Sequence, residues 1–467
     1  MVIRIDKRKN MDGYYDITIK IGYPDRLVPK YAGGEYTAQC DVGEDNLLFL
    51  IERTNDREFL EYCELLEEKG YSLHSENSLS GNIFKTYVSS EQMLHLIYRN
   101  FDSKVRIISA PMEKTVLIPN APKTVINDPR RCEITQMIIN YYSPDNSIIR
   151  QKGQDGNFGA CYIVTLDDGS LLVYDGGGCY NKEDEERLFG LLCEKGVRDG
   201  DEKIVISAWI ITHEHQDHYW CMYKTLLNHG DEIRIKQLYV TSMPLSFLKD
   251  GSFHGLDGVV QTDRLAEIYA NTARFEIVRM HTGQKFNIRN VQIEVLYTLE
   301  DIFPEHTSEY CEFNDTSTVT RMSVDGGTFM NLGDAYKIAS CVLCDMYGND
   351  LKSDICTVAH HGWGGCTVEV YDNIMPEIFT FPFSKKWFDR MINMTTRTNS
   401  KGEEVLWIQW AINRYGDFYK ATHRTFDIVD RDLNRYLLAD GCNKTIDLVT
   451  REVRNETVYN EQINYPY

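Results

Sequence analysis

A run of metal-ligand side chains directly after an apolar strand constrains this chain more than any other feature. Residues 213–218 are His-Glu-His-Gln-Asp-His, and they follow the apolar run 204–211. Three of the 12 histidines among the 467 residues fall in this hexapeptide. A short, continuously apolar run predicts a buried strand, and the pattern that begins at Cys221 predicts a helix. The hexapeptide therefore predicts a metal site between a buried strand and a helix.

The spacing within the hexapeptide bears on how many cations it serves. In an extended segment successive side chains point to opposite faces, so His213, His215 and Asp217 are expected on one side. His218 is expected to turn away and to serve a second metal. The zincin helix motif is excluded, because Asp217 rather than a histidine stands four residues after His213.

Composition narrows the class of protein. A chain of this length is too long for one ordinary core, so we expect two domains. The net charge of −20 opposes binding of phosphate backbones, so nucleic acid is an unfavoured but not excluded partner. No apolar run approaches the ~20 residues of a membrane span, and the start does not resemble a signal peptide. With 13 cysteines in no repeated spacing, these features predict a cytoplasmic protein with reduced thiols.

The patterns divide the chain into three parts. Residues 1–110 predict a small α+β domain, which we expect to shape the substrate site, to form a homo-oligomer or to bind a partner. Residues 111–132 contain four of the 12 prolines and predict a linker. Residues 133–467 alternate strand and helix patterns and predict the α/β catalytic domain.

Two later strand ends carry polar groups in the same way as the hexapeptide. Asp334 follows the strand-like run 328–332, and His360 and His361 follow the run 354–359. Another strand-like run ends at Asp175, before three glycines. Polar groups at strand ends are how α/β proteins build sites, and a carboxylate can bridge two cations. Taken alone, Asp334 could equally cap a helix.

The order of these groups along the chain resembles that of the metal-binding motifs in the metallo-β-lactamase superfamily. The most similar branch is the hydrolase domain of bacterial competence (DNA-uptake) channel proteins and its stand-alone relatives, through residues 314–317 (NDTS) and 353–362 (SDI to HHG). The resemblance covers roughly residues 133–450 and does not include the N-terminal unit. It implies an αββα sandwich, with the metals at one edge between the two sheets.

The resemblance also implies a role for each residue. His213 and His215 would bind a first metal, Asp217 and His218 a second, and Asp334 would bridge them. Either His360 or His361 would complete the second site, with His360 slightly favoured. The resemblance also implies Asp175 as the partner that orients a ligand histidine. Trp363, which stands between two glycines beside the expected metals, and Asn314 are expected to line the substrate pocket.

One departure from the family pattern concerns the first metal. Many members have a further histidine midway between the hexapeptide and the bridging aspartate. His254, His281 and His306 occupy that interval without a convincing motif. The first site is therefore expected to be incomplete or weaker, or to use a residue near Asn314.

Imidazole and carboxylate ligands without thiolate favour one or two Zn²⁺ ions, with Mn²⁺ or Fe as alternatives. The expected function is a metal-dependent hydrolase that uses a metal-activated hydroxide, oriented by Asp217, on a phosphodiester or other small ester-type substrate.

Three other functions compete with this one. A single-strand nuclease has a basic edge in Lys385, Lys386 and Arg390, but only 26 positions separate Asp334 from His360, too few for the domain inserted in RNA-processing members. A non-catalytic binding module on a degenerate site conflicts with the complete hexapeptide. An iron oxidoreductase would require a flavin domain, which residues 1–110 do not resemble.

Overall fold

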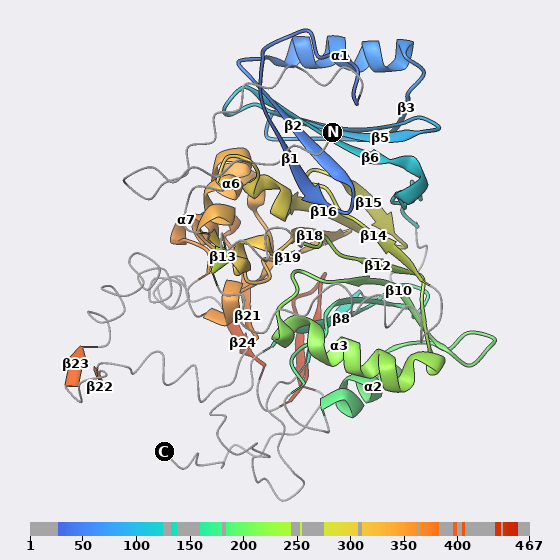
Figure 1. Cartoon of the computed structure of the whole chain (residues 1–467). Helices are drawn as coiled ribbons and strands as arrows, with labels where there is room; N and C mark the ends of the chain where they lie inside the picture. Colours follow the sequence, from blue (N-terminus) through green and yellow to red (C-terminus); the bar gives the residue numbers. More distant parts are fainter. Residues whose placement is uncertain are drawn as a thin grey trace, which may run out of the picture.

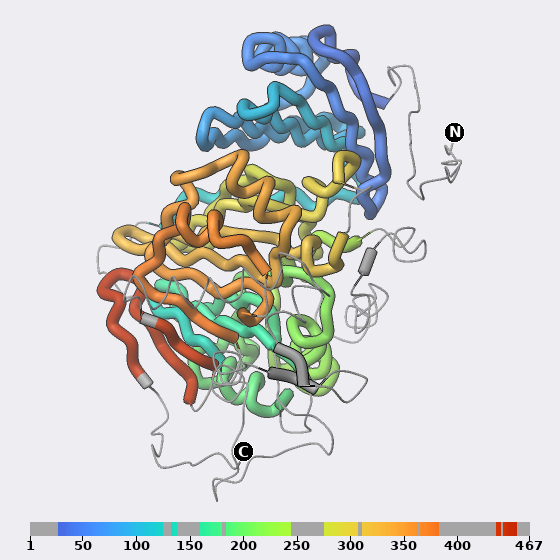
Figure 2. Tube along the Cα trace, turned by 90° about the vertical axis from the view of Figure 1, so that its left-hand side faces the viewer, coloured from blue at the N-terminus to red at the C-terminus, as the bar shows by residue number. Residues whose placement is uncertain are grey.

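The computed structural model describes residues 27–124, 132–137, 159–179, 184–243, 253–254, 275–306, 311–362, 365–382, 396–398, 404–406, 435–439 and 442–455. Figures 1 and 2 show the N-terminal unit at one end of the molecule, above the two sheets of the larger unit. No helix in these described ranges is long and apolar enough to cross a membrane.

The N-terminal unit is a six-stranded antiparallel sheet with one helix. Helix α1 begins after Asn55, whose side chain accepts a hydrogen bond from the Glu58 amide, and it buries Phe59, Cys63 and Leu66 at helical spacing. The predicted small α+β unit before the larger fold is therefore confirmed. The sheet order is β1-β2-β6-β5-β4-β3, and the bounds are β1 (Glu35–Gly43), β2 (Asn46–Glu52), α1 (Asp56–Glu68), β3 (Ser72–Leu79), β4 (Asn82–Val88), β5 (Gln92–Arg99) and β6 (Lys104–Pro111).

Both faces of this N-terminal sheet are covered. Along β2, Phe49 and Ile51 pack in the apolar cluster that contains α1. Leu48 and Leu50 point the other way and join a cluster that contains the helices of the larger unit. The N-terminal sheet is therefore a layer between α1 and the rest of the molecule.

The larger unit contains two mixed sheets. In the first, β14, β12, β10 and β9 are parallel neighbours, and β8, β7, β25 and β26 continue it antiparallel. The bounds are β7 (Glu133–Gln136), β8 (Cys161–Thr165), β9 (Leu171–Asp175), β10 (Ile204–Ile210), β11 (Ile233–Ile235), β12 (Gln237–Tyr239), β14 (Glu276–Val278), β25 (Lys444–Asp447) and β26 (Val453–Asn455); β11 pairs with β10.

The second sheet has the order β15-β16-β18-β19-β20-β21-β24. Its bounds are β15 (Lys285–Ile288), β16 (Val291–Tyr297), β18 (Val319–Val324), β19 (Gly327–Asn331), β20 (Ile355–Thr357), β21 (Ile378–Phe381) and β24 (Arg435–Leu438). Two short pairs lie apart from both sheets: β13 (Phe253–His254) with β17 (Cys311–Glu312), and β22 (Thr396–Thr398) with β23 (Glu404–Leu406).

The two sheets pack face to face through one apolar core. Tyr174 and Ile210 from the first sheet meet Ile293 and Phe329 from the second in a single buried cluster. Helices α2 (Asp184–Lys195) and α3 (Gln216–His229) cover the outer face of the first sheet, and α6 (Lys337–Tyr347) and α7 (Val368–Ile374) cover that of the second. This layering confirms the predicted αββα sandwich.

The segment predicted to be a linker lies along both units in its described part. Ile118 belongs to the core between the sheets, and its carbonyl oxygen lies 2.9 Å from Nε2 of His74. The Thr124 amide donates to the Arg289 carbonyl at 2.8 Å. Residues 125–131, including Pro129, lie outside the described part.

Candidate metal centre

Four strand ends deliver the site. β9 and β10 run parallel in the first sheet, so Asp175, the last residue of β9, and Thr212, just after β10, lie at the same edge. β19 and β20 run parallel in the second sheet, so Asp334 and His361 follow at a common edge there. The Thr318 amide donates to the Thr212 carbonyl at 2.8 Å and joins the two sheets beside the site.

The hexapeptide is not extended throughout. Helix α3 begins at Gln216, after His215 in an extended conformation (φ −71°, ψ 147°), and not near Cys221 as predicted. Asp217 and His218 therefore stand on the first helical turn, where a carboxylate interacts favourably with the helix dipole. The alternation expected for Asp217 was wrong, because the change to helical geometry brings it to the same centre as its neighbour His218.

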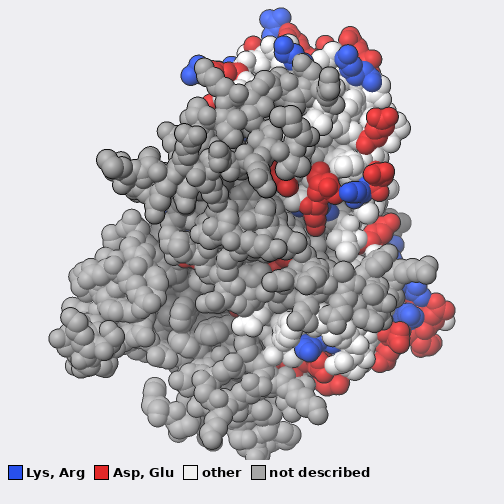
Figure 3. Space-filling model, in the orientation of Figure 1, with Lys and Arg blue, Asp and Glu red and all other residues white. Residues whose placement is uncertain are grey.

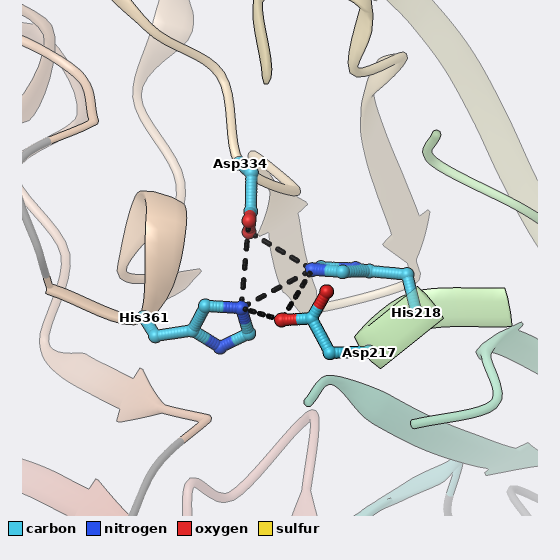
Figure 4. Close-up of side chains that lie close together, drawn as sticks. All are labelled: Asp217, His218, Asp334 and His361. Carbon is cyan, nitrogen blue, oxygen red and sulfur yellow. Dashed lines mark hydrogen bonds and ion pairs between the residues drawn. The ribbon is translucent and has the colours of Figure 1, made fainter. Parts of the chain in front are cut away.

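A first group of four side chains converges on one point (Figure 4). It consists of Asp217, His218, Asp334 and His361, whose candidate ligand atoms lie within 4.8 Å of one another. Nε2 of His218 lies 3.2 Å from Nε2 of His361 and 3.1 Å from Oδ1 of Asp334. Nε2 of His361 lies 2.9 Å from Oδ2 of Asp217. Ligands at ~2.0–2.2 Å from a tetrahedral Zn²⁺ are separated by roughly 3.3–3.5 Å, which is close to these distances.

A second group contains His213, His215 and Asp334. Nε2 of His213 lies 2.9 Å from Nδ1 of His215 and 3.8 Å from Oδ2 of Asp334. Asp334 thus belongs to both groups, as a bridging carboxylate would. We refer below to the four-residue group and the three-residue group.

The hydrogen bonds of the histidines orient their ligand atoms. Nδ1 of His218 lies 2.8 Å from Oδ2 of Asp175, and Nδ1 of His361 lies 3.0 Å from the Pro382 carbonyl oxygen. Each Nδ1 is placed to donate a hydrogen to these oxygens, which leaves Nε2 of each ring directed toward the centre and available to a cation. The two Nε2 atoms lie only 3.2 Å apart, a separation that requires a positive charge, from a proton or a metal ion, between them. The residues of the four-residue group therefore fit a metal ion.

The electrostatics also favour a cation here. Burial lowers the pKa of His361, but the carboxylates of Asp334 and Asp217 outweigh it and raise that pKa to about 10. Burial acts to raise the pKa of Asp334, yet His218 and His361 hold it well below the usual range. Positive charge is thus stabilised at this point, whether protons or a metal supply it.

Of the two adjacent histidines, His361 faces the centre. Both residues have left-handed backbones, with φ of 49° for His360 and 54° for His361, in the turn η6 (Ala359–Gly362). Such conformations cost energy in residues other than glycine and often mark functional sites. Nε2 of His360 instead lies 3.3 Å from Nδ2 of Asn314, and its ring lies edge-on to Tyr336. The slight sequence preference for His360 as the ligand is therefore not favoured by the geometry.

Two of the three histidines considered for the missing ligand of the first metal, His281 and His306, are described, and both make other contacts. Nδ1 of His281 lies 3.0 Å from both oxygens of Glu300, and its ring stacks on His95. His306 donates its amide to the Ile302 carbonyl at the end of η3 (Leu299–Ile302). The side chain of His254 lies outside the described residues, as do Trp363, Lys385, Lys386 and Arg390.

Two side chains of the site were not predicted from the sequence. The Thr212 hydroxyl lies 2.8 Å from Oδ2 of Asp175 and donates to that carboxylate next to His218. Phe313, in the turn η4 (Phe313–Thr316), places its ring centroid 4.9 Å from that of His215. Thr212 directly precedes the hexapeptide, a position that could have indicated its role; Phe313 has no comparable signal.

A family comparison now bears on the site. The metallo-β-lactamase superfamily model matches residues 155–296. This part of the chain belongs to that superfamily. The match contains Asp175 and the hexapeptide but ends before Asp334 and His361, which the geometry brings to the same site. No curated protein matches the chain.

Several solved structures share the metallo-β-lactamase fold at low similarity. The metallo-β-lactamase fold protein YhfI from Bacillus subtilis has 12% identity and a TM-score of 0.30, over 53% of this chain and 85% of that one. Zn²⁺-bound PqqB from Methylobacterium extorquens has 10% identity and a TM-score of 0.29, over 48% and 72%. CmlA, a diiron β-hydroxylase from Streptomyces venezuelae, has 13% identity and a TM-score of 0.28, over 50% and 45%. At these values none of them indicates what this chain acts on.

Proposed function

We propose that this metallo-β-lactamase superfamily protein is a zinc-dependent hydrolase of a phosphodiester or another small ester-type substrate. The observation that carries the proposal is the sharing of Asp334 between the three-residue and four-residue groups. Zn²⁺ is proposed because the groups offer imidazole and carboxylate donors without thiolate; Mn²⁺ or Fe would suit the same donors. The motif resemblance to competence-channel hydrolases supports the phosphodiester class.

Bound divalent cations would supply Lewis-acid chemistry and make nearby water a stronger acid. The chain's own residues then divide the remaining work. His213, His218, Asp334 and His361 are buried, whereas His215, Asp217 and His360 are only partly buried. A substrate would therefore approach past these last three. Asp217 would accept a hydrogen bond from the attacking water and orient it.

Charge supports a small substrate over a nucleic acid. On the described part of the face in Figure 3, basic side chains stand singly among acidic ones. With a net charge of −20, such a surface gives little attraction for a phosphate backbone. The proposed partner is therefore a small molecule, and the proposed location is the cytoplasm of a bacterium.

The test is an activity panel with the purified protein and its native metal. The panel holds a bis-aryl phosphodiester, a phosphomonoester, a lactone, a thioester, a cephalosporin and single-stranded nucleic acid. We expect phosphodiester or ester turnover that falls by at least about 100-fold in His215→Ala. His229→Ala is the matched control. His215 stands at the start of α3 and His229 at its end, where His229 pairs with Glu186 and Glu232. Absence of bound metal, with equal activity in all variants, would end the hydrolase proposal.

A further inference from the structure

A buried arginine of the N-terminal sheet binds the larger unit. Arg106, in β6, is 0% exposed. Its guanidinium donates to the carboxylate of Asp301, to the carbonyl of Asp301 at 3.2 Å, and to Oε2 of Glu305 at 2.5 Å. Both acceptor residues, Asp301 and Glu305, belong to residues 298–306, which we call the η3 segment. A buried cation requires such compensation, so this contact fixes the η3 segment against the N-terminal sheet.

The same carboxylates bind further groups on both sides. Glu305 also accepts hydrogen bonds from Arg99 at 2.8 Å and from Lys104 at 2.5 Å, both on the N-terminal sheet. The second carboxylate oxygen of Asp301 accepts a hydrogen bond from the Thr282 hydroxyl at 2.6 Å, within the larger unit. The η3 segment is therefore held by a network of charged hydrogen bonds, which are stronger than neutral ones.

From the η3 segment the chain leads to the three-residue group. Sγ of Cys311, the first residue of β17, donates to the His306 carbonyl at 3.1 Å, and η4 follows β17. The Phe313 ring centroid lies 4.9 Å from that of His215 and 6.3 Å from that of His213. Phe313 thus lies beside the three-residue group.

Apolar packing supports the same connection. Ile302, Phe303 and Phe313 are each 0% exposed and belong to one cluster with Leu50 and Ile108 of the N-terminal sheet. Because closely packed interiors transmit displacement, a shift of the η3 segment would move Phe313. The four-residue group has different supports, since Asp175 and the Pro382 carbonyl orient its histidines.

We propose that Arg106 is a positioning residue of the metal centre: it fixes the η3 segment, and thereby holds Phe313 against His215. The inference rests on the proposed function, because it assumes that the two groups bind metal. It assigns the N-terminal unit a part in the chemistry, namely to support the three-residue group and not the four-residue group.

The test is calorimetric titration of Zn²⁺ into the metal-free full chain. In Arg106→Met we expect one binding event to weaken by at least about tenfold and the other to change less than about twofold. His215→Ala identifies the three-residue group, because it should abolish the event that Arg106→Met weakens. Arg321→Met is the matched control: Arg321 binds Glu294 of the second sheet through two hydrogen bonds of 2.9 and 2.6 Å, and not Asp301 or Glu305 of the η3 segment. This control should leave both events unchanged.

A second variant and a measurement on the wild type keep the test decisive if Arg106→Met fails to fold. Arg106→Met with Asp301→Asn removes both charges, while Glu305 keeps Arg99 and Lys104. In wild type, zinc loading should slow hydrogen exchange in residues 298–306, because coupling between sites is reciprocal. Equal losses at both zinc positions, unchanged binding in the variants, or unchanged exchange would overturn this inference alone. A wild type that binds no zinc would overturn the proposed function as well.

Discussion

The Oδ2 atom of Asp175 lies 2.8 Å from Nδ1 of His218, on the side of the ring opposite to the metal-facing Nε2. Asp175 ends β9 and His218 stands on the first turn of α3, which follows the parallel neighbour strand β10, so the two residues meet at one edge of the sheet. A carboxylate in this place fixes the tautomer of the imidazole and makes its other nitrogen a better ligand.

The first prediction concerns this pair. Asp175→Asn keeps the size of the side chain but removes the charge that supports His218. We expect zinc affinity to fall by about 10- to 100-fold, as calorimetry would measure. Asp168→Asn, in the turn before β9, is the control, because Asp168 bonds to Ser170 and not to a histidine of the site. Equal affinities in all three proteins would contradict the role assigned to Asp175.

A second prediction separates the adjacent histidines. Because Nε2 of His361 faces the four-residue group and Nε2 of His360 faces Asn314, only His361→Ala should lose a metal ion. We expect elemental analysis to show about one zinc fewer per chain in His361→Ala and full occupancy in His360→Ala. Loss of zinc from His360→Ala alone would restore the preference drawn from the sequence.

A third prediction concerns pH and His95, which lies 1% exposed between the two units. Burial, reinforced by the neighbouring His281, lowers the pKa of His95 to about 3. An unfolded chain binds this proton near pH 6.5, so between these values the unfolded state holds more protons. His95 therefore costs the folded state up to about 1.4 kcal/mol for each unit that the pH falls from about 6.5 toward about 3.

His95→Gln tests this sign. The variant loses packing near pH 7 but escapes the penalty at lower pH. The difference in free energy of unfolding between wild type and variant should therefore narrow as the pH falls from 7 to 5 in urea titrations. Parallel curves over that interval would show that His95 is not held neutral.

A fourth prediction concerns two glycines, Gly176 after β9 and Gly190 within α2. A Cβ atom on Gly176 would lie 2.6 Å from Cβ of Met222 on α3, the helix that carries Asp217 and His218. Gly176→Ala should therefore lower both the unfolding midpoint and the zinc affinity. Gly190 is exposed within α2 and a Cβ atom there meets nothing within 4 Å, so Gly190→Ala should stabilise the protein by about 0.5–1 kcal/mol. Thermal unfolding of the two variants should shift in opposite directions.

The alternating strand and helix patterns predict an α/β domain whose strands end in polar residues, whereas the αββα sandwich follows only from the resemblance to the metallo-β-lactamase superfamily. The sequence does not predict where α3 begins. His215 makes no side-chain capping bond, so none of the usual capping residues marks that helix start. Nor can sequence separate His360 from His361, since only the left-handed turn decides which ring points inward. The part played by Arg106 depends on partners about 200 positions away, at Asp301 and Glu305.

The burial of both faces of the N-terminal sheet has a practical consequence for anyone who divides this chain. A fragment that starts at residue 133 would uncover apolar side chains such as Ile302 and Val342, and one that ends at 110 would uncover Leu48 and Leu50. Exposed apolar surfaces of that kind lead to aggregation. The boundary that composition suggests near residue 110 is therefore a poor place to cut, and the larger unit should be expressed together with the N-terminal sheet.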